Sequence, residues 1–116
     1  MVPQTFKGFN AKVTLHADRV EIKRALTAKI GGAKDAVIML TDVVEPLSKA
    51  PTRMLNGYVY LATNPDPEHL RIWADAPRTK IGGNPQAILF TWWQREAQAE
   101  FMTALEAARR ALRPDA

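Results

Sequence analysis

Side chains that carry out chemistry in most enzymes are scarce in this sequence. There is no cysteine, which excludes disulfides, thiolate nucleophiles and cysteine-based metal sites. The two histidines, His16 and His69, lie far apart, and neither has a second ligand at a spacing that suits a metal ion. Ser48 is the only serine and stands in no nucleophile-elbow pattern. We therefore expect a protein that is not an enzyme and that uses neither a metal nor a cofactor.

A local excess of basic residues is the first candidate binding feature. The chain carries a formal net charge of +4, and residues 19–34 hold five bases against Glu21 alone. The bases are Arg19, Lys23, Arg24, Lys29 and Lys34. Runs of charge usually solvate an exposed face. The alternative is a patch that attracts an anionic membrane, where each base contributes about 1 kcal/mol. Nucleic acid is a weaker alternative, because no aromatic residues interleave with these bases.

Adjacent tryptophans provide the second candidate feature. Helical spacing places Trp93 in an apolar stripe, so Trp92 points elsewhere. Trp92 then either covers the edge of a sheet or serves as an exposed anchor of a protein interface, with Arg95 one turn away. The irregular segment 46–53 is the other place where we expect a partner. The candidate interface residues are Pro46, Arg53, Trp92 and Arg95.

Alternation of apolar and polar residues predicts that most of the chain forms strands. In residues 11–17 and 19–24 the period of two indicates an antiparallel hairpin with one exposed face. Asn56-Gly57 predicts a turn before a strand that is rich in β-branched and aromatic residues. We expect a loop over residues 48–52. The strands expected from these patterns cover residues 5–9, 11–17, 19–24, 35–40, 41–47, 58–62, 70–73 and 87–90, of which 41–47 either continues the preceding strand or begins the next.

The apolar period changes near residue 91 and predicts a C-terminal helix over about residues 92–112. Thr91 and Gln94 have the spacing of a capping box. Apolar residues then recur every three or four positions: Trp93, Ala97, Phe101, Ala104, Leu105, Ala108 and Leu112. Residues 1–116 are thus expected to form a single, mainly β domain. We expect a small antiparallel sandwich or barrel of about seven strands, with the helix closing its open end.

These features resemble the pleckstrin-homology (PH) superfold, and more specifically the bacterial PH-like family described as domain of unknown function 4429. The resemblance covers almost the whole chain and rests on the hairpin over 12–24, AVIML followed by TDV, NGYVYL, NPQAILF and QREAQAEFMTAL. As a single domain, the chain is similar to the single-domain members of this family in actinobacteria and their phages. The resemblance implies a seven-stranded partial barrel or sandwich capped by an amphipathic helix, and a binding scaffold without catalysis.

The resemblance does not extend to the basic signature with which eukaryotic PH domains bind phosphoinositides. The first strand–loop–strand offers only Lys7 and Lys12 before its tip, so that specificity is not carried over. We expect instead a non-catalytic module that binds another protein, or associates with itself, through a strand edge or a helix face. Peripheral contact of the 19–34 segment with an anionic membrane is the alternative. The first residues lack the apolar stretch of a signal peptide, so we expect a cytoplasmic location.

Overall fold

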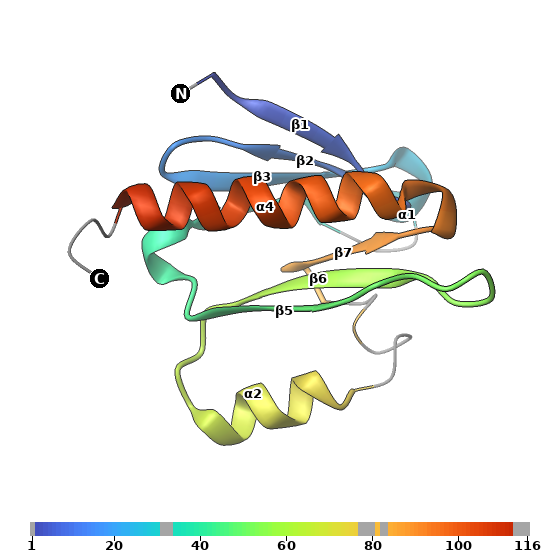
Figure 1. The fold of residues 1–116 in the computed structure, drawn as a ribbon. Coiled ribbons are helices and arrows are strands. Elements are labelled where there is room, and N and C mark those ends of the chain that lie inside the picture. The colour runs from blue at the N-terminus through green and yellow to red at the C-terminus, as the bar shows by residue number, and fades with distance from the viewer. Residues whose placement is uncertain (1, 31–33, 77–80, 82–83, 113–116) are drawn as a thin grey trace.

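The computed structural model describes residues 2–30, 34–76, 81 and 84–112. In these residues the chain forms two antiparallel sheets, with one long helix lying across the opening between them (Figure 1). The four-stranded sheet has the order β1 (Gln4–Lys7), β2 (Ala11–Leu15), β3 (Arg19–Arg24) and β4 (Ala36–Met39). The three-stranded sheet has the order β5 (Glu45–Lys49), β6 (Gly57–Ala62) and β7 (Ala87–Phe90). The long helix is α4 (Arg95–Leu112). These elements confirm the expected mainly β architecture of seven strands and a C-terminal helix.

Shorter helical segments connect the strands. They are α1 (Leu26–Ile30), the 3-10 turn η1 (Leu40–Asp42), α2 (Pro67–Ala74) and the 3-10 turn η2 (Trp92–Gln94). Turn η1 carries the chain from the first sheet to the second, whereas η2 leads directly into α4. Helix α2 lies against the second sheet on the side away from α4 (Figure 1).

The alternating pattern of β2 and β3 fixes which side chains enter the core. Val13 lies opposite Ile22, and Leu15 lies opposite Val20. All four side chains are buried, whereas Lys12, which precedes Val13, is exposed. A shift of one residue in either strand would exchange the two faces, so the apolar pattern itself sets the register.

Helix α4 closes the core between the sheets with the stripe that the sequence predicts. Phe101, Leu105 and Ala108 are buried in the main hydrophobic cluster. The ring of Phe101 packs on Phe6 of β1, with a centroid separation of 5.4 Å. The predicted capping box is also present, since Gln94 Oε1 accepts the N–H of Thr91 at 3.1 Å.

The prediction that Trp93 belongs to this stripe is wrong. Its side chain is 85% exposed. The reason is that Trp93 lies in η2, and a 3-10 turn advances by a larger angle per residue than an α-helix. Extending the α-helical period backward from α4 therefore gives the wrong direction for this side chain.

The strand predicted over residues 70–73 is also wrong, because these residues belong to α2. Asp66 caps the helix by accepting the N–H of Glu68 at 3.0 Å, and Pro67 occupies its first turn. Four residues of alternation fit a short helix as well as a strand. Here Leu70 and Trp73, three apart, pack against a second cluster that includes the buried Tyr58 and Tyr60. Both faces of β6 are buried for this reason.

Strand β5 extends the second sheet into part of the segment that was expected to be a loop. The loop predicted over 48–52 begins later, because Ser48 and Lys49 pair with Val59 and Tyr58 of β6. Pro46 lies opposite Leu61 within the same strand.

The β1–β2 turn joins the sheets without closing them into a barrel in the described part of the chain. At one corner Phe9 donates its N–H to the carbonyl of Leu89 at 2.7 Å. Gly8 permits this approach, since a Cβ there would lie 2.7 Å from both Ile88 Cγ2 and Leu89 O. Just before β5, Val44 donates its N–H to Ala62 O at 2.8 Å, which extends the pairing of β5 with β6.

The packing of α4 predicts very different losses of stability for substitutions at two apolar residues that the sequence places in one stripe. Phe101→Ala should reduce the free energy of unfolding by about 3–5 kcal/mol, because it removes a fully buried ring. Trp93→Ala should change it by less than about 0.5 kcal/mol, because the side chain is exposed. Urea denaturation followed by circular dichroism measures both values, and similar losses for the two variants would contradict this packing.

Candidate functional site

The outer edge of β5 carries backbone groups that no other described strand occupies. Leu61 of β6 donates its N–H toward β7, to Gln86 O at 3.0 Å. Because the direction of backbone groups alternates along antiparallel strands, Lys49 and Leu47 bond to β6, whereas Ser48 turns its N–H and C=O outward. Pro46, which has no N–H, has the same outward orientation as Ser48. The edge therefore offers one complete donor–acceptor pair at Ser48.

A hollow of about 320 Å³ lies between this edge and the first half of α4. We call it the β5–α4 groove. Its wall on the sheet side is Ser48, Ala50 and Pro51, and the helix side is largely apolar. The lining residues from η2 and α4 are Trp92, Arg95, Gln98, Ala99 and Met102.

Two side chains of α4 hold the helix at both ends of β5. Gln98 is buried, and its Nε2 donates to Lys49 O at 2.8 Å and to Tyr58 O at 3.1 Å. Near the other end, Arg109 Nη2 donates to Val44 O at 3.2 Å. Gly57 makes the first contact possible, because a Cβ there would lie 2.6 Å from Gln98 Oε1. These ties set the width of the groove.

Three of the four predicted interface residues meet where the groove opens. The guanidinium carbon of Arg95 lies 4.1 Å from the centroid of the Trp92 ring, and that of Arg53 lies 5.6 Å from it. Pro46 is not among them, since it lies near the start of β5. Trp93 and Met54, whose side chain is 90% exposed, adjoin the three residues. We call the five residues the tryptophan corner.

The tryptophan corner encloses a second hollow of about 410 Å³, between the β5–β6 hairpin and η2. Thr52 orders the hairpin, because its Oγ1 accepts the N–H of Leu55 at 3.0 Å and its own N–H donates to Leu55 O at 2.8 Å. Trp92 lines both this hollow and the β5–α4 groove. The corner is thus an exposed apolar surface with two cations at the end of the groove.

The structure does not gather the five predicted bases of residues 19–34 into one patch. Arg19 pairs with Asp18 at 2.9 Å and with Glu21 at 3.3 Å. Lys29 pairs with Asp35 at 3.1 Å. Lys23 and Lys34 are exposed, but Arg24 is buried. Alternation along β3 turns Arg24 inward and Lys23 outward.

Arg24 connects three segments of the chain. Its guanidinium donates to Lys34 O at 3.2 Å, to Asn84 O at 3.3 Å and to Pro85 O at 2.9 Å. Burial lowers the pKa of Arg24 below its usual value. Its backbone N–H donates to Asp35 Oδ1 at 2.7 Å, and this bond is the main cause of the lowered pKa of Asp35. We assign Arg24 to the structure of the fold and not to a surface site.

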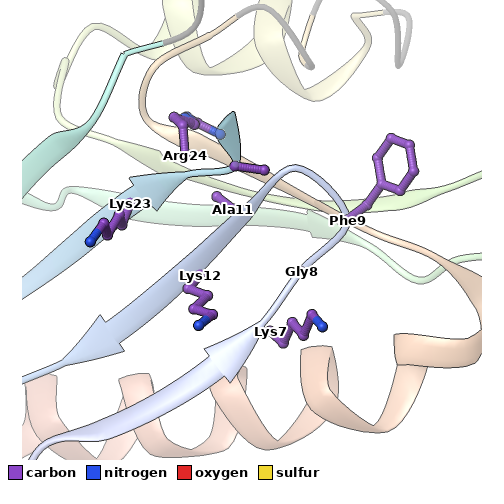
Figure 2. Close-up of a pocket in the computed structure, with 8 residues that line it drawn as sticks. Lys7, Gly8, Phe9, Ala11, Lys12, Lys23 and Arg24 are labelled. Carbon is purple, nitrogen blue, oxygen red and sulfur yellow. The ribbon is translucent and has the colours of Figure 1, made fainter. Parts of the chain in front are cut away.

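A different group of bases lies side by side on the exposed face of the first sheet. Lys7 pairs with Lys12, and Lys12 pairs with Lys23, on three adjacent strands. Figure 2 shows these lysines around a hollow of about 270 Å³, with the ring of Phe9 pointing away from the sheet. No ion pair joins them to a carboxylate of the described residues, and like charges directly opposite one another are destabilising. The sequence alone does not reveal this lysine row, because the row depends on the register of three strands.

The histidines are held in ordinary structural contacts. His16 Nε2 lies 3.3 Å from Glu21 Oε1, and His69 Nε2 lies 3.1 Å from the hydroxyl of Tyr60. Burial raises the pKa of Tyr60. Within the described residues, no group of three histidine, aspartate or glutamate side chains could hold a metal ion.

The contrast between Arg24 and its neighbour predicts different costs of substitution. Arg24→Met should lower the free energy of unfolding by about 2–4 kcal/mol, because three carbonyls lose a charged donor. Lys23→Met should be neutral or stabilising by about 0.5 kcal/mol at low salt, because it relieves repulsion from Lys12. Guanidinium denaturation measures both variants, and a neutral Arg24→Met would contradict the structural role.

No family model, curated protein or solved structure matches this chain. Among the helices that the structure describes, none is long and apolar enough to cross a membrane.

Proposed function

We propose that this protein is a non-catalytic interaction domain that binds an extended segment of another protein in the β5–α4 groove. The segment adds to the second sheet as a fourth strand beside β5. The observation that carries the proposal is the outward N–H and C=O of Ser48 at the edge of a hollow with an apolar helical wall. Strand addition takes affinity from main-chain hydrogen bonds and specificity from neighbouring side-chain pockets.

The β5 edge suits a partner strand better than the β4 edge does. Near β4 the hollow is lined by strand residues together with Asp42, Thr63 and Gln86, and no helix forms a wall. Beside β5, in contrast, Ala99 and Met102 provide an apolar surface for alternate side chains of the added strand. The edge of β7 is partly occupied, because Leu89 bonds to Phe9 and Asn10 of the β1–β2 turn.

We further propose that the domain belongs to the PH-like superfold and is related to the domain-of-unknown-function 4429 family. The order of four strands, three strands and a C-terminal helix supports this. So does the position of the matching motifs, since AVIM forms β4 and GYVYLA forms β6. This assignment leaves the proposed partner unchanged, because a fold does not by itself determine a function.

A single substitution at the free edge tests strand addition. Ser48→Pro removes the outward N–H, and the fold should tolerate it because Pro46 already occupies the equivalent orientation two residues earlier. Peptides selected from a random displayed library on the wild-type protein should bind Ser48→Pro at least about tenfold more weakly. Fluorescence anisotropy of labelled synthetic peptides measures the affinities.

Ser48→Ala is the matched control, because it keeps the N–H and should leave the affinity within about twofold. A second measurement does not depend on either variant: amide exchange at Ser48 of the wild-type protein should slow when peptide is bound. Equal binding to Ser48→Pro, an unprotected Ser48 amide or a library without any selected binder would each refute strand addition. A peptide-independent dimer that protects the same amide would show a second copy of the chain as the occupant instead.

The lysine row supports a second candidate function, peripheral attachment to an anionic membrane. Lys7, Lys12 and Lys23 lie together, none of them forms an ion pair with a carboxylate of the described residues, and Phe9 beside them is 58% exposed. Helix α1 begins next to Phe9, since Ala25 donates its N–H to Asn10 O at 3.1 Å. Adjacent bases attract anionic lipid, and apolar side chains enter the interface.

Vesicle sedimentation tests this second function. With vesicles of phosphatidylcholine containing about one third phosphatidylserine, the double variant Lys12→Glu/Lys23→Glu should bind at least about tenfold more weakly than wild type at low salt. Arg71→Glu/Arg110→Glu is the control of equal charge change, because both arginines are exposed on other elements. Equal losses in the two double variants would mean that net charge alone drives binding, which would contradict a dedicated row.

A further inference from the structure

The two arginines of the tryptophan corner come from different elements and meet at one ring. Arg53 lies in the β5–β6 hairpin, and Arg95 is the first residue of α4. Both guanidinium groups lie within cation–π distance of Trp92. Arg95 is also held by a hydrogen bond from its Nη1 to Trp92 O at 2.8 Å. The two ring contacts and this hydrogen bond place both positive charges at Trp92.

These arginines have no acidic partner among the residues that the structure describes. Arg19, Arg71 and Arg109 each form an ion pair with a carboxylate. Neither Arg53 nor Arg95 has such an ion pair. A guanidinium has five N–H donors, and stacking on an aromatic ring leaves the donors along its edge available. The corner thus presents two cations with free hydrogen-bonding capacity.

The corner lies in line with the β5–α4 groove. Trp92 forms a wall of the groove and also a wall of the hollow of about 410 Å³ beyond it. Strand β5 runs from Glu45 toward this end. An added strand that continues the antiparallel pattern of the sheet runs the other way, so its N-terminal end lies at Arg53 and Arg95.

We infer that the segment bound beside β5 carries an acidic side chain on the N-terminal side of its strand-forming residues, where Arg53 and Arg95 bind it. The inference rests on the proposed function and adds the chemical class of the partner. Charge complementarity supports this inference. A segment bound in the groove reaches two guanidinium groups that have no ion pair among the described residues, and an acidic side chain would neutralise them. Exposed Trp93 and Met54 beside them provide apolar contact around the acidic group.

A double-mutant cycle between protein and peptide tests the inference. Peptides selected on the wild-type protein should be enriched in aspartate or glutamate on the N-terminal side of their apolar residues. Replacing that residue by its amide should weaken binding to the wild type by about tenfold. The same replacement should weaken binding to Arg53→Gln/Arg95→Gln by less than about twofold, because the groups that recognise the acid are gone.

Arg110→Gln is the control for general charge effects, because Arg110 is exposed in the last turns of α4. This variant should keep the full preference for the acidic peptide. Lys12→Gln is the control for the lysine row and should also keep it.

The outcomes separate the inference from the function on which it rests. Selected peptides that depend on the Ser48 N–H but show no acidic preference would overturn the inference and leave strand addition intact. An acidic preference that is lost in Lys12→Gln or Arg110→Gln and kept in Arg53→Gln/Arg95→Gln would also overturn it. Peptides that ignore Ser48→Pro would refute strand addition, and the inference would fail with it.

Discussion

The attachment of α4 to both ends of β5 is the constraint on which the rest of the structure depends. Phe101 and Leu105 bury the helix between the sheets, which stabilises the fold without fixing how the helix lies along β5. Gln98 and Arg109 fix the orientation of the helix along β5, because both donate hydrogen bonds to backbone carbonyls at the ends of the strand. Apolar burial is not directional, whereas hydrogen bonds are. The apolar stripe therefore brings the helix to the sheets, and two polar side chains determine the groove beside it.

Every open sheet has edges that can pair with other chains. In this protein the edges of β7 and β5 differ in how many backbone groups remain open to such pairing. The β1–β2 turn occupies part of the β7 edge, with Gly8 allowing the close approach. On β5, Pro46 removes one outward N–H and two residues later Ser48 keeps one. A proline in an edge strand limits indiscriminate pairing. A single remaining donor–acceptor pair beside a helical wall allows pairing of a short segment and opposes the growth of a long intermolecular sheet.

The sequence predicts the elements that have a long or repeated pattern and fails where the pattern is short. The hairpin of β2 and β3 and the helix α4 follow their apolar periods closely, because one face of each is buried. Alternation over residues 70–73 predicts a strand where helix α2 lies, although the sequence contains the Asp66-Pro67 capping signal. The direction of Trp93 was wrong because a 3-10 turn shifted the phase of the helix. Local geometry of a few residues overrides a period that is established only further along the chain.

The sequence also did not predict which basic side chains of the candidate site come together in the tertiary structure. Composition indicated that basic residues matter, but it could not separate Lys23 from Arg24, which face opposite sides of β3. Pairing across strands then created the lysine row from Lys7, Lys12 and Lys23, which lie on three consecutive strands at unequal spacings in the sequence. Arg53 and Trp92 met for a similar reason, since the hairpin and η2 belong to the same end of the second sheet. Residue type predicts which side chains are able to bind an anion, whereas strand register and edge position determine which of them remain free to do so.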